Sequence, residues 1–164
     1  MPHIHTGTGE LDFTVCGYIV HDNKTLLIKH KYLPIWTPPS GHIEVNQTPV
    51  EALYNEIQEE AGIAADALEL IPTQTYHPSF TRSSTAEELP LPFDFEVHPV
   101  VDGHRHINVS YVLKSDTNHV EPGQGESNTF KWFTVDELRH FKDTNESIIS
   151  SAIFAIEHVR ENQG

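Results

Sequence analysis

The sequence predicts an α/β (α+β) domain in which a mixed β-sheet is sandwiched between helices. Three observations point to this fold class. Runs rich in β-branched and aromatic residues, bounded by turn residues, make up most of the patterned chain. One well-marked helix lies near the middle of the sequence, and an amphipathic helix closes it. Strands do not alternate regularly with helices, which argues against a wholly parallel sheet.

The chain begins with a predicted β-hairpin. Residues 12–20 (DFTVCGYIV) and 25–30 (TLLIKH) are strand-type runs on either side of the turn sequence HDNK. The following residues, 31–41 (KYLPIWTPPSG), contain three prolines and a glycine. This composition predicts an irregular loop.

The best-marked element is a helix predicted over residues 49–61. Thr48 is placed to be its N-cap, Pro49 its first helical residue, and Glu51 the partner of Thr48 in a capping box. Gly62 supplies the stop signal, because glycine readily adopts the left-handed conformation that ends a helix.

The next segment predicts strands separated by loops. Residues 67–80 are expected to form one or two strands, interrupted by prolines, and residues 81–93 a polar surface loop. Residues 94–101 and 106–114 flank the sequence DGHR, whose Asp-Gly pair predicts a second hairpin.

The last part of the chain predicts one strand and then helical structure. Residues 129–135 (TFKWFTV) form a strand-type run that ends in a second capping box, Thr134 with Glu137. Residues 145–162 follow, with isoleucine and valine side chains able to share one face of an amphipathic helix.

Length, composition and charge exclude several classes of protein. A chain of 164 residues is expected to form one domain, 1–164. Acidic residues outnumber basic ones by 24 to 10, which disfavours binding to nucleic acid or to anionic membranes. The single cysteine excludes an internal disulfide. The sequence shows no signal-peptide pattern and no apolar run of roughly 20 residues, so we expect a cytoplasmic protein.

Three glutamates gather on the predicted helix 49–61. At about 100° per residue, Glu56, Glu59 and Glu60 fall on one arc, beside the apolar arc that would pack on a sheet. Their mutual repulsion costs about 0.2–0.5 kcal/mol per pair, and the helix dipole disfavours the two in the last turn. These costs are small enough for a solvated acidic face, so the cluster by itself fits either such a face or a metal site.

The surrounding sequence resembles the Nudix box. Residues 41–63 (GHIEVNQTPVEALYNEIQEEAGI) follow the family pattern G-x5-E-x7-R-E-U-x-E-E-x-G-U, in which U is a bulky aliphatic residue. The matching positions are Gly41, Glu56, Ile57, Glu59, Glu60, Gly62 and Ile63. The preceding hairpin and the later TFKWFTVDEL also look like Nudix proteins, so a Nudix-type fold is expected for most of the chain.

Two positions depart from the family pattern. Gln47 stands where the family has glutamate, and Asn55 where it has arginine. In the family these two residues form an ion pair that braces the catalytic loop against the helix. Because both charges are absent together, we expect the two amides to hydrogen-bond each other and to leave metal binding intact.

The resemblance implies a metal-dependent hydrolase. Family members use Mg²⁺ or Mn²⁺ to cleave nucleoside diphosphates linked to another group, and hard cations of this kind prefer oxygen ligands. It implies Glu56 and Glu60 as direct metal ligands, with Glu59 and the carbonyl of Gly41 contributing. Either Glu59 or Glu126 would be the general base that activates water, and Glu121 competes with Glu126 for the role of the loop acid.

The substrate is expected to be a small nucleotide, and three classes stay open: NDP-sugars, (d)NTPs and dinucleoside polyphosphates. Pro78 lies about where a proline occurs in family members that act on NDP-sugars. A homodimer is left open, because many family members are dimers and the sequence does not decide.

Other readings are weaker. A non-catalytic Nudix-fold nucleotide-binding or sensor module would explain the changes at Gln47 and Asn55. An isopentenyl diphosphate isomerase, a Nudix relative, would need a reactive cysteine, but Cys16 lies in an apolar strand pattern. His104 and His106 lie two residues apart beside a turn, but no set of histidines and cysteines has a known zinc-ligand spacing.

Overall fold

The structure is a computed structural model that describes residues 11–100 and 103–163. The strands are β1 (Leu11–His21), β2 (Lys24–Lys29), β3 (Trp36–Thr37), β4 (Ser40–His42), β5 (Leu68–Ile71), β6 (Asp94–Pro99), β7 (Arg105–Ser115) and β8 (Phe130–Phe133). The helices are α1 (Pro49–Ala61), the 3₁₀ turn η1 (Ala65–Ala67), α2 (Val135–His140) and α3 (Glu146–Glu161). The predicted mixed sheet between helices is confirmed.

The strands of the described chain form one sheet centred on β1 and β7. The sheet runs in the order β3-β2-β1-β7-β5, while β4 pairs with β1, β6 with β7 and β8 with β2. β1 and β7 are parallel over ten residue pairs, from Leu11 with Arg105 to Val20 with Lys114. The other pairings are antiparallel, including the predicted hairpins β1–β2 and β6–β7. Pairing of strands so distant in sequence places the N-terminal end of β1 beside the start of β7.

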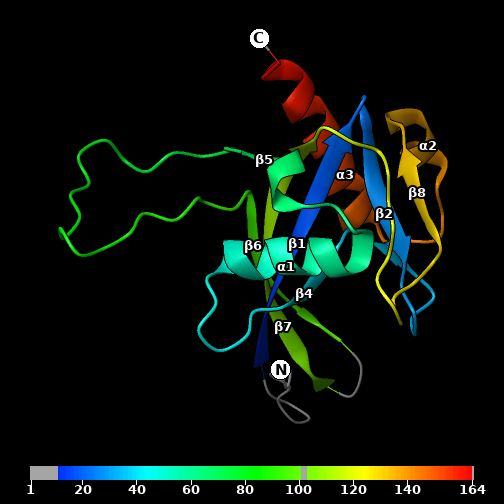
Figure 1. Ribbon diagram of the computed structural model, residues 1–164, viewed down its shortest axis with the longest axis horizontal. Coiled ribbons are helices and arrows are strands. Elements are labelled where there is room, and N and C mark those ends of the chain that lie inside the picture. The colour runs from blue at the N-terminus through cyan, green and yellow to red at the C-terminus, as the bar shows by residue number, and fades with distance from the viewer. Residues whose placement is uncertain (1–10, 101–102, 164) are drawn as a thin grey trace.

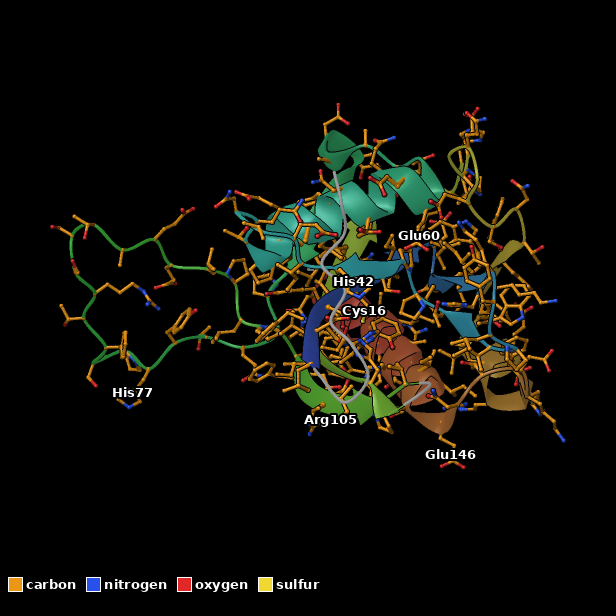
Figure 2. All side chains as sticks on the ribbon, turned by 90° about the horizontal axis from the view of Figure 1, so that it is seen from below. Cys16, His42, Glu60, His77, Arg105 and Glu146 are labelled. Carbon is orange, nitrogen blue, oxygen red and sulfur yellow. The ribbon has the colours of Figure 1, made fainter. Side chains whose placement is uncertain are left out.

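The sheet separates two hydrophobic cores. Figure 1 shows α1 across one face and α3 on the other, and Figure 2 shows these layers from a second direction. Side chains alternate along β1, so Val15 and Ile19 join the core beneath α1, whereas Cys16, Tyr18 and Val20 join the core beneath α3. Both faces of β1 are therefore buried, which explains why its sequence is an almost continuous apolar run.

Gly17 allows α1 to lie close to the centre of the sheet. A Cβ atom at Gly17 would lie 2.8 Å from the Cδ1 atoms of both Leu53 and Leu113. Leu53 on α1 is fully buried in the same core. The helix that carries the glutamates is thus fixed to β1 by direct side-chain packing.

Truncation of this contact is expected to destabilise the fold. Leu53→Ala would lower the free energy of unfolding by about 2–5 kcal/mol, because it removes a buried isobutyl group and leaves a cavity. Urea denaturation measures the loss, and Glu69→Ala, at an exposed position of β5, is a suitable control with a change within about 0.5 kcal/mol. A loss below about 1 kcal/mol for Leu53→Ala would show that this packing matters little.

The structure corrects two predicted segments. Residues 31–41 were expected to be irregular, but they contain β3 and β4; the prolines lie outside these short strands and so remove no ladder hydrogen bond. The strand structure expected over 67–80 is limited to β5 and ends before Pro72. Residues 72–93 form a long loop that extends away from the body of the molecule (Figure 1). In the described part of the chain, none of the helices has the length and apolar character needed to cross a membrane.

Candidate functional site

The helix α1 has the ends that its sequence predicts. The Thr48 side chain accepts a hydrogen bond from the Glu51 N–H, and the Glu51 carboxylate accepts one from the Thr48 N–H, both at 3.2 Å. Gly62 adopts a left-handed conformation with φ of 67° and donates its N–H to the Gln58 carbonyl. These caps fix the start and the end of the helix and therefore the positions of its glutamates.

Gly41 on β4 faces the Glu56 carboxylate. A Cβ atom at Gly41 would overlap this carboxylate, so a residue with a side chain would have to displace it. β4 pairs with β1 through Gly41 opposite Val15, which holds the backbone of the strand in place. The structure thus brings together Gly41 and Glu56, which the sequence predicts as neighbours in a metal site.

Glu60 is held against β4 in a partly buried position. Its Oε1 accepts a hydrogen bond of 2.8 Å from the backbone N–H of Ser40. Burial, together with the charges of Glu126 and Glu59, raises the pKa of Glu60 to about 7, against the opposing effects of the Ser40 N–H and Lys31. In the protein without a metal ion, the negative charge of this site is therefore poorly compensated at neutral pH.

This raised pKa makes the stability of the metal-free protein depend on pH. Glu60 in the unfolded chain titrates near 4.5, so between that pH and about 7 the folded state keeps a proton that the unfolded state has lost. The stabilisation is complete below pH 4.5 and is lost as the pH rises through about 7. It amounts to roughly 3 kcal/mol, at about 1.4 kcal/mol for each pKa unit. Chemical denaturation in the presence of a chelator should show this loss in the wild type.

Glu60→Gln is expected to abolish this part of the pH dependence, because glutamine does not titrate. The control Glu69→Gln, at an exposed position on β5, should retain it. If wild type and Glu60→Gln lose stability in parallel between pH 5 and 8, the titration belongs to another group.

A loop after β7 docks onto the C-terminal end of α1. The N–H groups of Glu121 and Gly123 donate to the carbonyls of Ala61 and Glu59, each at 2.8 Å. These bonds satisfy carbonyls that a helix end otherwise leaves without partners. Gly62 is needed at this junction, since a Cβ there would overlap the Glu121 carbonyl. The docked loop carries Glu126 to the end of α1 where Glu59 and Glu60 lie.

The two acidic residues of this loop point in different directions. Glu126 is 25% exposed, and its Oε2 lies 3.6 Å from the Lys31 ammonium. Glu121 is 81% exposed and lies 3.5 Å from His119. The charge of Glu126 also contributes to the raised pKa of Glu60. The structure therefore groups Glu126, and not Glu121, with the glutamates of α1.

Gln47 does not hydrogen-bond Asn55, which corrects the expected amide pair. Its Oε1 accepts a hydrogen bond of 3.0 Å from the Glu44 N–H, and its own N–H donates to the Glu44 carbonyl at 3.1 Å. Asn55 is exposed on α1. The two bonds to Glu44 close a local turn, so Gln47 stabilises the loop before α1 from within.

Cys16 is remote from the glutamates. Its thiol is buried in the core beneath α3, on the face of the sheet opposite α1, and lies 3.1 Å from the Ser110 hydroxyl. Burial raises the pKa of this thiol, which keeps it protonated. This placement removes the basis for an isomerase that uses a cysteine beside the glutamates of α1.

Sequence reasoning missed two residues at the site and one cluster elsewhere. Ser40 and Lys31 reach Glu60 and Glu126 from the loop that was expected to be irregular. Among the described residues, Asp12, His104 and His106 form a set whose candidate ligand atoms all lie within 4.8 Å of one another. The three glutamates of α1 are not grouped this tightly in the described structure. The closely spaced histidines were a visible signal, but their carboxylate partner comes from the other end of the chain.

Comparison with known proteins identifies the family. The NUDIX domain model matches residues 11–152, so the chain belongs to the NUDIX family. A crystal structure of a NUDIX-family hydrolase from Clostridium perfringens superposes with a TM-score of 0.80 at 30% sequence identity, covering 90% of this chain and 97% of that chain. The predicted family and fold are therefore confirmed.

Two curated relatives match shorter stretches. A Bacillus subtilis protein, YjhB, whose name proposes an ADP-ribose pyrophosphatase activity, is 30% identical over 73 residues, 38% of this chain and 35% of that protein. An RNA pyrophosphohydrolase from Francisella tularensis is 23% identical over 114 residues, 65% of this chain and 69% of that protein. The match thus spans about a third of the first relative's length.

Proposed function

We propose that this protein is a metal-dependent pyrophosphohydrolase that cleaves the diphosphate linkage of a nucleoside diphosphate derivative by attack of water on phosphorus. The observation that carries the proposal is the convergence of Glu60 and Glu126 at the end of α1, produced by loop docking and by the Ser40 N–H. Membership of the NUDIX family supports it.

The donor set fits a hard divalent cation. All the groups in question are oxygens: the carboxylates of Glu56, Glu59 and Glu60 and the carbonyl of Gly41. The missing side chain at Gly41 leaves the room that the Glu56 carboxylate occupies. The ionised form of Glu60 is disfavoured by burial and by neighbouring carboxylates, so a bound cation would stabilise that form.

The metal ion and the surrounding side chains would have different roles in the reaction. When bound, Mg²⁺ or Mn²⁺ would neutralise the diphosphate and lower the pKa of the attacking water. Glu126 would accept the proton of that water, with Glu59 as the competing base. Lys31, 3.6 Å from Glu126, would help to hold this carboxylate in place beside the site.

The proposed substrate class is an NDP-sugar or a related nucleoside diphosphate, such as ADP-ribose. The name of the Bacillus relative favours this class, and Pro78 on the long loop agrees with it. The name of the Francisella relative favours RNA as the alternative substrate. A net charge of −14 argues against a long polyanion, because it would repel the strand beyond the reacting phosphates.

A hydrolysis screen tests the proposal. Purified protein with Mg²⁺ or Mn²⁺ is incubated with NDP-sugars, (d)NTPs, dinucleoside polyphosphates and a 5′-triphosphorylated RNA, and the phosphate products are quantified. Metal-dependent cleavage of at least one small nucleotide, with most activity on NDP-sugars, is the expected result. Nucleotide binding without turnover under all of these conditions would replace the hydrolase with the sensor alternative.

A further inference from the structure

Four histidines and a buried carboxylate gather at the N-terminal end of β1 and the start of β7. The parallel register places Asp12 opposite His106, and the antiparallel register of β6 places His98 opposite the same residue. His42 enters from β4, and His104 from the residues just before β7. Segments from four parts of the chain therefore converge on one point, which no local sequence pattern would require.

The Asp12 carboxylate is the centre of this cluster. Its side chain is fully buried, and Oδ2 lies 2.6 Å from His104 Nε2 and 3.2 Å from His42 Nε2. The ring centroid of His106 lies 5.2 Å from that of His104 and 5.4 Å from that of His42. One carboxylate oxygen thus lies within hydrogen-bonding distance of two imidazoles, with a third ring beside them.

The spacing of the ligand atoms is close to that of a zinc site. The candidate ligand atoms of Asp12, His104 and His106 all lie within 4.8 Å of one another. A tetrahedral ion with bonds of about 2.0–2.1 Å holds its ligand atoms roughly 3.4 Å apart. Side-chain rotations that move these atoms by about an ångström would therefore complete the site, without movement of the paired strands.

Hydrogen bonding within the cluster does not account for all of its polar atoms. His104 Nδ1 is buried and has no hydrogen-bond partner in the described structure, although the other nitrogen of the same ring contacts Asp12. An unpaired buried polar atom costs about 1–3 kcal/mol. Rotation of the His104 ring toward a shared ligand would remove this cost.

The charge state of the cluster also suits a metal ion. Burial and the neighbouring histidines together lower the pKa of His106 to about 4, so its imidazole is neutral at neutral pH. Neutral imidazoles and a carboxylate are the protonation states in which these side chains bind metals. Nitrogen-rich sets of this kind select zinc-like ions, whereas the oxygens of the α1 site select Mg²⁺ or Mn²⁺.

We propose that Asp12, His104 and His106 bind a divalent transition-metal ion, with Zn²⁺ as the representative, at a site separate from the glutamates of α1. His42 is a positioning residue, because its hydrogen bond orients the Asp12 carboxylate. The ion would cross-link β1 to β7. Figure 2 shows His42 and Glu60, which belong to the two different clusters, on β4 and α1. This inference does not depend on the proposed hydrolase activity.

Zinc titration of the full-length protein tests the site. After removal of metals with a chelator and dialysis, Zn²⁺ is titrated by calorimetry, and Co²⁺ is added separately to look for the visible absorption of a four-coordinate ion. We expect one tight equivalent per chain, a Co²⁺ spectrum that Zn²⁺ removes, and a higher midpoint of thermal unfolding with Zn²⁺. Absence of any stoichiometric binding would overturn the proposal.

Paired variants locate the bound ion. His104→Ala/His106→Ala should weaken the tight equivalent at least about 100-fold and remove the Co²⁺ spectrum. His119→Ala/His140→Ala changes two histidines that are 76% and 78% exposed elsewhere on the surface, and should bind as the wild type does. Glu56→Gln/Glu60→Gln should also retain tight Zn²⁺, which separates this site from that of α1.

A conservative variant covers the case in which the double alanine variant does not fold. Asp12→Asn keeps the shape of the side chain and one oxygen acceptor but removes the anionic ligand, so its zinc affinity should fall while its thermal unfolding without metal stays cooperative. Wild-type zinc affinity in a folded Asp12→Asn or His104→Ala/His106→Ala protein would show that the ion binds elsewhere.

Discussion

Glu60→Gln is expected to lower kcat/KM for the preferred nucleotide by at least about 100-fold. Glutamine keeps the size of the side chain and an oxygen that can accept the Ser40 N–H, but it removes the negative charge that a divalent ion would bind. Steady-state kinetics over a range of Mg²⁺ concentrations measure the effect. We expect a higher Mg²⁺ requirement together with a lower maximal rate.

The same substitution should stabilise the metal-free protein near pH 8. The ionised form of Glu60 is disfavoured there, mainly by burial, and a neutral amide avoids that cost. Opposite effects on activity and stability are typical of residues retained for function. The control Glu69→Gln, at an exposed position on β5, should change neither quantity. A Glu60→Gln protein that hydrolyses nucleotides at the wild-type rate would rule out Glu60 as a ligand.

The parts of the site encoded within a few residues were predictable from the sequence. The bounds of α1 follow from Thr48, Pro49 and Gly62, each of which acts on the backbone next to it. The helical repeat of about 100° per residue and the two helix caps together place the glutamates on one arc of the helix. These features need no knowledge of the rest of the chain, so one sequence is enough to find them.

Contacts between distant segments were not predictable in the same way. Glu126 was a candidate by resemblance, but its separation from Glu121 depends on the loop that docks onto Ala61 and Glu59. The parallel pairing of β1 with β7 joins residues more than ninety positions apart, as in Asp12 with His106. A periodic pattern predicts that a strand forms but does not name its partner. The histidine cluster was therefore visible only as two neighbouring histidines.

The hydrogen-bond partner of Gln47 shows a different limit of prediction from sequence. Replacement of both charged residues of the family pattern suggested that Gln47 and Asn55 bond each other, yet the Glu44 N–H is closer in sequence and forms the bond with Gln47. A local partner costs less conformational entropy than one across the loop and helix. Sequence alone identified the lost ion pair but not which backbone group would replace it.

Substitution of the general base is expected to have the second large effect on activity. Glu126 is favoured over Glu59 because its carboxylate is partly buried, lies 3.6 Å from the Lys31 ammonium and affects the pKa of Glu60 more than Glu59 does. Glu126→Gln should lower kcat by about 10²–10⁴-fold with little change in KM or in the Mg²⁺ requirement.

Two matched variants make this result decisive. Glu59→Gln, if Glu59 is a metal ligand, should instead raise the Mg²⁺ requirement. Glu121→Gln changes a carboxylate of the same docked loop that is 81% exposed, so its kinetics should match the wild type. An unchanged kcat in Glu126→Gln, together with a large loss of kcat in Glu59→Gln at saturating Mg²⁺, would assign the base to Glu59. Equal losses in Glu121→Gln and Glu126→Gln would instead mean that both substitutions act by loosening the loop from the end of α1.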